Sequence, residues 1–186
     1  QDLDCLLEMI LLGAKDLTNA DGGSLYILED RTLNFVLVHT RSLGVTMGGT
    51  SKQPIKFPPL SLDDPSGRPN LKMVVTSAVN EDKAVNIPDA YQDTEYDLSG
   101  TKAFDAKTGY HSQSLLAIPM KDHEGTIIGV LQLINATDPD TDEVTPFSAT
   151  DESLVSSLSS QAAIALNRKR LIDGLENLLN SLGKLS

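Results

Sequence analysis

Apolar residues at both ends of the chain recur with the spacing of an amphipathic helix. Between Leu3 and Leu17 they lie three or four residues apart, which predicts a first helix. From Leu154 to Leu182, alternating steps of four and three residues meet an apolar side chain at seven of nine positions. Such a seam is typical of a coiled coil, and it predicts a long last helix that begins near Ser148.

The middle of the chain alternates apolar stretches with turns and long loops, as expected for a sheet with irregular connections. The extended segments that we predict are 24–28, 33–40, 55–57, 84–87, 114–120 and 126–134. Residues 19–23 are expected to form a turn after the first helix, and residues 71–80 a short helix. The stretches 42–70 and 92–109 are interpreted as functional loops, the second with room for a helical turn.

Composition indicates one domain with a core of its own. The chain has 186 residues, of which 40% are hydrophobic and only 4% aromatic, so the core is expected to consist mainly of aliphatic side chains. The chain does not begin with Met and ends inside a helical pattern, which suggests a piece of a larger protein. We expect residues 1–168 to form the domain and residues 169–186 to continue as a signalling helix toward an output domain.

Charge and cysteine content limit the partners. A net charge of −11 disfavours nucleic acid and anionic membrane surfaces as partners, because both repel an acidic protein. No apolar run approaches the roughly 20 residues of a membrane span. The single cysteine, Cys5, cannot form an internal disulfide, which fits a reducing compartment and predicts a cytoplasmic location.

The residues that could carry chemistry do not form the pattern of an active site. His39, His111 and His123 lack the spacing of metal ligands. The acidic runs show no paired-carboxylate pattern, and a phosphate-binding loop of the Walker type is absent. We therefore expect no catalysis by this chain, no metal and no covalently bound cofactor.

Several blocks, in order along the chain, closely resemble GAF domains, a family of sensory modules. They are 86–91, 108–110, 114–120, 128–135, Phe147, 151–152 and 161–166. The finer pattern at 57–59, 67–70 and 99–105 looks like the cyclic-nucleotide phosphodiesterase and adenylate cyclase type. It is similar in particular to bacterial GAF domains that precede an HD-GYP phosphodiesterase domain.

The resemblance implies an α+β fold with a central antiparallel sheet of about six strands. The terminal helices would pack on one face of this sheet, and the ligand-pocket loops would lie on the other. The family's Asn-Lys, Phe and Asp-Glu motif falls on Asn135, Ala136, Phe147, Asp151 and Glu152. The motif lysine, which pairs with the aspartate in the family, is replaced by Ala136, so we expect Asp151 to serve the start of the last helix.

The resemblance also implies a nucleotide pocket. Its positions in this chain are Ser24, His39, Thr40, Asn70, Tyr91, Thr108 and Gln132. Gln132 is the most informative of them, because an amide within an apolar strand needs hydrogen-bond partners. Asn70 precedes the expected short helix and is the candidate for holding a phosphate. Ser24 as a strand-edge hydroxyl and Tyr91 as a core residue are the structural alternatives.

Three functions follow from these features. The first is a regulatory sensory domain that binds a small molecule, with a cyclic nucleotide as the leading ligand and signalling through the last helix. The second is the same domain with haem or an organic acid as ligand. The third is a ligand-free dimerisation module, which Ala136 and the apolar seam favour. A homodimer through the terminal helices would use Ile172, Leu175, Leu179 and Leu182.

Overall fold

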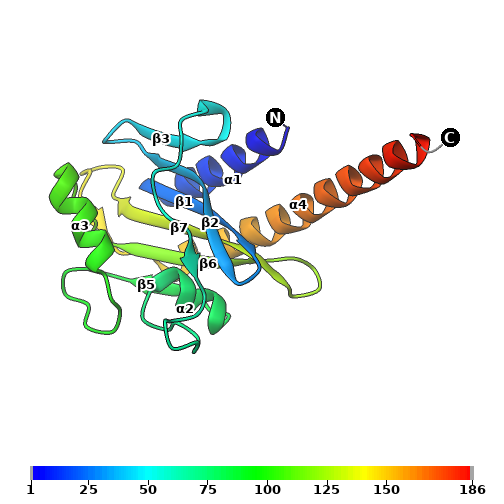
Figure 1. The fold of residues 1–186 in the computed structure, drawn as a ribbon. Coiled ribbons are helices and arrows are strands. Elements are labelled where there is room, and N and C mark those ends of the chain that lie inside the picture. The colour runs from blue at the N-terminus through cyan, green and yellow to red at the C-terminus, as the bar shows by residue number, and fades with distance from the viewer. Residues whose placement is uncertain (1, 185–186) are drawn as a thin grey trace.

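An antiparallel sheet forms the centre of the structure, a computed structural model that describes residues 2–184 (Figure 1). Its main path runs β3-β2-β1-β7-β6-β5, and the short strands β4 and β8 pair with β2 and β7. Neighbouring strands are antiparallel throughout. The elements are α1 (Asp2–Thr18), β1 (Ala20–Glu29), β2 (Thr32–Thr40), β3 (Val45–Gly48), the 3₁₀ helix η1 (Gly49–Ser51), β4 (Leu60–Ser61), α2 (Val74–Asn80), β5 (Val85–Ile87), α3 (Ser99–Thr108), β6 (Leu115–Lys121), β7 (Ile127–Thr137), β8 (Val144–Thr145) and α4 (Ala149–Gly183).

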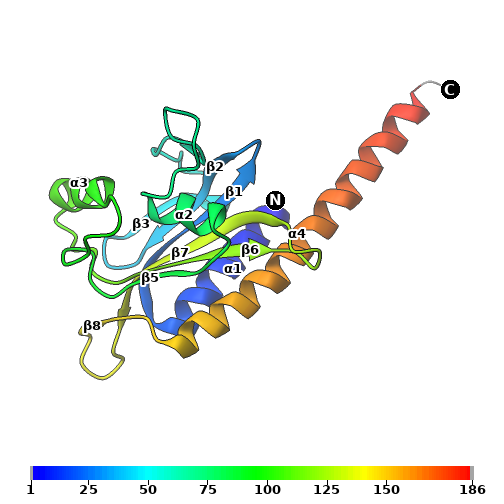
Figure 2. The same ribbon diagram turned by 90° about the horizontal axis from the view of Figure 1, so that it is seen from below.

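The terminal helices cover one face of the sheet. Figure 2 shows α1 and the first half of α4 along the same side of the strands. Leu11 of α1 and Val155 of α4 are buried there in one cluster with Leu131 of β7. Gly23 in β1 allows α1 to lie this close, because a Cβ at Gly23 would meet Leu11 Cδ1 at 2.7 Å. The expected α+β architecture, with the terminal helices on one face of the sheet, is confirmed.

The opposite face of the sheet carries α2, α3 and the long loops (Figure 2). A second buried cluster joins Val75 and Ala78 of α2 to Tyr26, Leu115 and Val130 of the strands. The central strands β1, β6 and β7 are therefore covered on both faces, which explains why β6 and most of β7 are almost continuously apolar.

Helix α4 begins as the sequence predicts and continues beyond the domain. Ser148 Oγ accepts a hydrogen bond from Asp151 N at 3.0 Å, and Asp151 Oδ2 accepts one from Ser148 N at 2.9 Å. These two bonds form a capping box, which satisfies two backbone donors at the helix start. The last buried residue of the helix is Leu166, and from there α4 projects away from the sheet to Gly183 (Figure 1). Within residues 2–184, no helix has the length and apolar character that crossing a membrane requires.

The expected turn at residues 19–23 is wrong for four of its five residues. Only Asn19 has the left-handed backbone of a turn, with φ 54°. Ala20 already begins β1, and Gly22 pairs with Thr40 of β2 and Ile134 of β7. Pairing on both sides outweighs the weak strand propensity of glycine here.

The segments between β2 and β6 also differ from the prediction. Residues 55–57 are not a strand, because β3 and β4 occupy the free edge of β2. Helix α2 begins at Val74 rather than residue 71, since Asn70 Oδ1 accepts from Lys72 N at 3.0 Å and Met73 is extended. The stretch 92–109 contains a full helix, α3.

Candidate cavity on the loop face of the sheet

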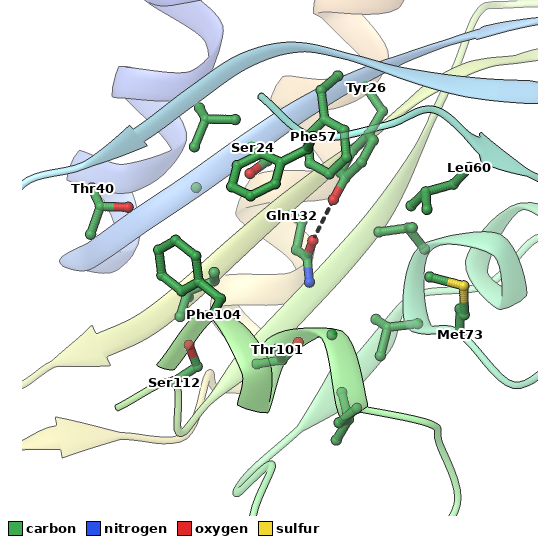
Figure 3. Close-up of a pocket in the computed structure, with 18 of the residues that line it drawn as sticks. Ser24, Tyr26, Thr40, Phe57, Leu60, Met73, Thr101, Phe104, Ser112 and Gln132 are labelled. Atoms are coloured by element: carbon green, nitrogen blue, oxygen red, sulfur yellow. Dashed lines mark hydrogen bonds between the residues drawn. The ribbon is translucent and has the colours of Figure 1, made fainter. Parts of the chain in front are cut away.

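A cavity of about 260 Å³ lies between the loop face of the sheet and the segments that carry α2 and α3 (Figure 3). Strands β1, β2 and β7 form its floor with Ser24, Tyr26, Thr40 and Gln132, among other residues. The walls come from the segment before β4, the start of α2, the first half of α3 and the segment after it; they include Phe57, Leu60, Met73, Thr101, Phe104 and Ser112. The volume is close to the lower end of the ~300–1,000 Å³ that is typical of small-molecule sites.

Aromatic side chains gather around this cavity. Five of the chain's eight Phe and Tyr residues line it. Their ring centroids follow one another at 4.4 Å from Tyr26 to Phe35, 5.2 Å to Phe57, 6.1 Å to Phe104 and 6.3 Å to Tyr110. These spacings lie in the range of favourable ring contacts. These five side chains, which we call the aromatic wall, offer flat apolar surfaces to a planar ligand.

Gln132 supplies a polar group at the floor. Its Oε1 accepts a hydrogen bond from the Tyr26 hydroxyl at 2.9 Å. Its amide nitrogen points into the cavity, as Figure 3 shows, and makes no hydrogen bond within residues 2–184. Gln132 therefore has one partner in the protein and one free donor group that a ligand can use.

A hydrogen-bond cluster at the start of β1 joins the cavity wall to the sheet. The Tyr110 hydroxyl donates to Asp21 Oδ2 at 2.7 Å and accepts from Asn135 Nδ2 at 3.1 Å. Asp21 also accepts from the backbone nitrogen and the hydroxyl of Ser42. Burial raises the pKa of Asp21, but the bonds from Ser42 and Tyr110 outweigh burial and hold that pKa below its ordinary value. Asp21 is thus an ionised acceptor that orients Tyr110.

The cavity carries little positive potential. Its lining residues, all within residues 2–184, include one carboxylate, Asp97, and no lysine or arginine. Asp97 accepts from Ser99 N at 3.0 Å, and hydrogen bonds from Ser99 lower the pKa of Asp97. The backbone N–H groups of Gly100 and Thr101, in the first turn of α3, make no hydrogen bond within the described residues. They are the donors available for an anionic group.

Three of the seven predicted pocket residues, Ser24, Thr40 and Gln132, line the cavity. His39 lies on the other face of the sheet, because neighbouring residues of a strand point to opposite sides. There the Lys15 ammonium of α1 contacts His39 Nδ1. Burial and the charge of Lys15 lower the pKa of His39, so its imidazole is neutral at pH 7.

The other three predicted pocket residues lie outside the cavity. Asn70 makes the turn before α2, and its carbonyl accepts from Asn80 Nδ2 at 3.1 Å. It does not open the helix, so the phosphate-binding role expected at the helix start has no geometric basis. The Tyr91 hydroxyl donates to Asp105 at 2.6 Å, and the Tyr91 ring stacks on His111. Thr108 donates to the carbonyl of Phe104 in the last turn of α3.

The motif residues hold the fold together. Asn135 is buried and bonds to the segment that precedes β6. Phe147 is buried on the helix face, and its carbonyl accepts from Asn86 Nδ2 at 2.9 Å. The same nitrogen donates to Glu152 at 2.9 Å, and Asp151 completes the capping box. Each motif residue thus has a structural partner.

Sequence reasoning missed most of the aromatic wall. Alternation along β1 from Ser24 would have found Tyr26. Phe35 is hidden by a β-bulge: Leu25 pairs with Leu37 but Tyr26 pairs with Phe35, so Val36 is an extra residue. The bulge changes the alternation and turns Phe35 toward the cavity. Phe57 lies in a loop, and Phe104 lies in α3, within a stretch that the sequence predicts to be a loop, so no periodicity indicates either position.

Comparison with known proteins identifies the family. Residues 2–166 match the GAF domain model. A cGMP-specific 3',5'-cyclic phosphodiesterase of Drosophila melanogaster is 32% identical over 137 residues, which are 73% of this chain and 11% of the relative. The GAF domain/HD domain protein from Geobacter sulfurreducens superposes with a TM-score of 0.62 at 17% identity, over 91% of this chain and 95% of that chain. A GAF domain from a phosphoenolpyruvate-protein phosphotransferase of Coxiella burnetii gives 0.63 at 18%, over 92% and 86%.

The chain belongs to the GAF domain family. GAF domains are regulatory sensory domains rather than catalytic ones, as the sequence predicts for this chain. The chain spans about a tenth of the length of the curated relative described above. The two solved structures support the fold alone, given their low sequence identity.

Proposed function

We propose that this GAF domain is a sensory module that binds a small planar ligand in the cavity on the loop face, and that a cyclic nucleotide is the leading candidate. The observation that carries the proposal is the aromatic wall around a free amide donor, that of Gln132. A heterocyclic base packs well between aromatic rings. The cGMP-specific activity named for the Drosophila relative supports a nucleotide.

The two ends of a cyclic nucleotide would meet different parts of the cavity. The base would lie over the floor near Gln132, and the phosphate would accept hydrogen bonds from the free N–H groups of Gly100 and Thr101. Because no lysine or arginine of the described residues lines the cavity, the phosphate would be held by neutral donors and by the helix dipole. Binding would order α3 over the cavity and bias the position of α4.

Haem or an organic acid is the alternative ligand. No histidine is among the lining residues, all of which lie in the described part of the chain. A haem in this cavity would therefore lack an imidazole ligand. An organic acid would meet the same free N–H groups but would leave the aromatic wall without a partner. Both features favour the nucleotide.

Calorimetric titration with cyclic GMP, cyclic AMP and cyclic-di-GMP tests the proposal. Phe57→Ala removes an aromatic wall and should weaken binding about 5- to 50-fold, the equivalent of ~1–2.5 kcal/mol of lost ring contact. Tyr91→Ala is the matched control, because this aromatic residue lies outside the cavity, and it should bind within about threefold of wild type. Absence of binding heat and of a thermal shift with all three nucleotides would refute the nucleotide proposal.

A second proposed function is dimerisation through the terminal helices, with residues 169–186 leading to an output domain. The predicted dimer positions Ile172, Leu175, Leu179 and Leu182 are 45–66% exposed on the projecting part of α4. An apolar stripe of this kind is unfavourable in water. Pairing with the helix of a second copy would bury the stripe and lower the free energy. A cytoplasmic location and the likeness to bacterial HD-GYP regulators stay predictions.

Light scattering measures the dimer directly. Leu175→Asp combined with Leu179→Asp should convert a dimer to a monomer, because both charges would fall in the helix seam. Asn177→Asp combined with Asn180→Asp adds the same charge outside the seam and should leave the dimer in place. A wild-type protein that is monomeric at high concentration contradicts the proposed interface.

A further inference from the structure

The contact between Tyr26 and Gln132 fixes which hydrogen-bonding group the floor of the cavity offers. Tyr26 lies on β1 and Gln132 on the neighbouring strand β7, both on the loop face. The Tyr26 hydroxyl donates to Gln132 Oε1 at 2.9 Å. Figure 3 shows that this bond turns the oxygen of the amide toward Tyr26 and the nitrogen toward the open cavity.

The tyrosine is held in place and keeps its proton. Tyr26 is only 3% exposed, and its ring contacts that of Phe35 with centroids 4.4 Å apart. Burial raises the pKa of Tyr26, so the hydroxyl is protonated at every pH at which the domain would work. Within residues 2–184 this hydroxyl makes no other hydrogen bond.

The opposite orientation of the amide is therefore unfavourable. It would turn the Gln132 nitrogen toward the Tyr26 hydroxyl and leave the tyrosine proton, which has no second acceptor, buried without a partner. A buried donor without an acceptor destabilises the structure. The observed orientation satisfies the tyrosine proton and leaves the two N–H groups of the amide facing the ligand.

We propose that Tyr26 and Gln132 together make the cavity selective for a ligand that presents a hydrogen-bond acceptor to the floor, such as a 6-keto purine, over one that presents a donor, such as a 6-amino purine. This inference rests on the proposed function. Ser24, the strand partner of Gln132, does not impose the same choice, because a hydroxyl can turn to donate or accept. Discrimination between the two purines then comes from the amide, because the Gln132 N–H groups and a 6-amino group are both donors and would leave each other unpaired.

Titration of four proteins with cyclic GMP and cyclic AMP tests this inference. Wild type should bind cyclic GMP about 10- to 100-fold more tightly than cyclic AMP. Tyr26→Phe keeps the ring but frees the amide to turn, so the preference should fall to about threefold or less. Gln132→Leu removes the amide donor without adding a charge, so the preference should likewise fall to about threefold or less. Thermal unfolding of each variant checks that the domain is folded.

Tyr110→Phe is the matched control. Tyr110 also lines the cavity, but its hydroxyl bonds to Asp21 and Asn135 rather than to Gln132. Its loss should leave the ratio of the two affinities within about twofold of wild type, even where both affinities change. A uniform change in all variants would show packing effects instead of selection by the amide, and would overturn the inference.

The outcomes separate the inference from the proposed function. Equal binding of both nucleotides by wild type, a preference for cyclic AMP, or an unchanged preference in Tyr26→Phe overturns the inference and leaves nucleotide sensing intact. Failure of wild type to bind either nucleotide overturns the nucleotide proposal, and the inference with it. A preference for cyclic GMP that Tyr26→Phe removes and Tyr110→Phe preserves supports both.

Discussion

Replacing Asn135 by alanine removes four hydrogen bonds from one buried position. Asn135 Oδ1 accepts from Gln113 N at 2.7 Å and Ser114 N at 3.1 Å, and Nδ2 donates to His111 O at 2.8 Å and to the Tyr110 hydroxyl at 3.1 Å. The backbone of Asn135 is left-handed, with φ 58°, a conformation that asparagine tolerates better than alanine. The substitution therefore removes partners from backbone groups and adds strain.

The magnitude follows from the two backbone donors. Each buried N–H that loses its acceptor costs about 1–3 kcal/mol, and the left-handed backbone costs alanine about 1 kcal/mol. We expect Asn135→Ala to lower the free energy of unfolding by about 3–7 kcal/mol, a large part of the roughly 5–15 kcal/mol of a typical domain. The melting temperature should fall by about 6–28 °C.

Urea unfolding followed by circular dichroism measures this loss. Asn135→Gly separates the two causes, because glycine also lacks the side chain but adopts a positive φ without strain. The glycine variant should be more stable than the alanine variant by about 1 kcal/mol. A loss below about 1 kcal/mol for Asn135→Ala, with folded wild type under the same conditions, would refute this account of Asn135.

Two further substitutions test buried polar groups. The hydroxyl of Ser159 in α4 is buried and has no hydrogen-bond partner within residues 2–184, so Ser159→Ala should raise the free energy of unfolding by about 1 kcal/mol in urea titrations; a loss of stability would show that the hydroxyl has a partner. The pKa of Asp21 is lowered in the folded state. The ionised form therefore stabilises the fold fully above the ordinary pKa of about 4, and this stabilisation is lost as the pH falls through the lower pKa of the folded state. Asp21→Asn should therefore be less stable than wild type at pH 7 and approach it near pH 2, and a difference that does not depend on pH would contradict the ionised role.

The terminal helices and most of the central strands could be predicted because their patterns repeat over many residues. Periodic apolar positions between Leu3 and Leu17 place α1, and the hydroxyl and acid of Ser148 and Asp151 mark the start of α4. Short elements escaped because partners far away in the sequence decide them. Ala20–Gly23 resembles a turn locally, yet pairing with β2 and β7 makes it a strand.

Prediction of the candidate site was limited by strand geometry. Thr40 and His39 are neighbours in the sequence, but they lie on opposite faces of β2, so only Thr40 reaches the cavity. The bulge at Val36 then reverses the alternation for Phe35. Gln132 was identifiable because an amide in an apolar strand is conspicuous, whereas the orientation of that amide depends on Tyr26, 106 residues away in the chain.

Ala136 bears on the helix face of the sheet rather than on the cavity. Its side chain is buried in the cluster that contains the terminal helices, and it is absent from the cavity lining. Asp151, which the motif lysine would pair with, accepts a hydrogen bond from the backbone nitrogen of Ser148, so the replacement does not leave the Asp151 carboxylate without a partner. Ala136 in place of the motif lysine is thus no argument against ligand binding in the cavity. The case for or against a ligand therefore rests on the aromatic wall and Gln132.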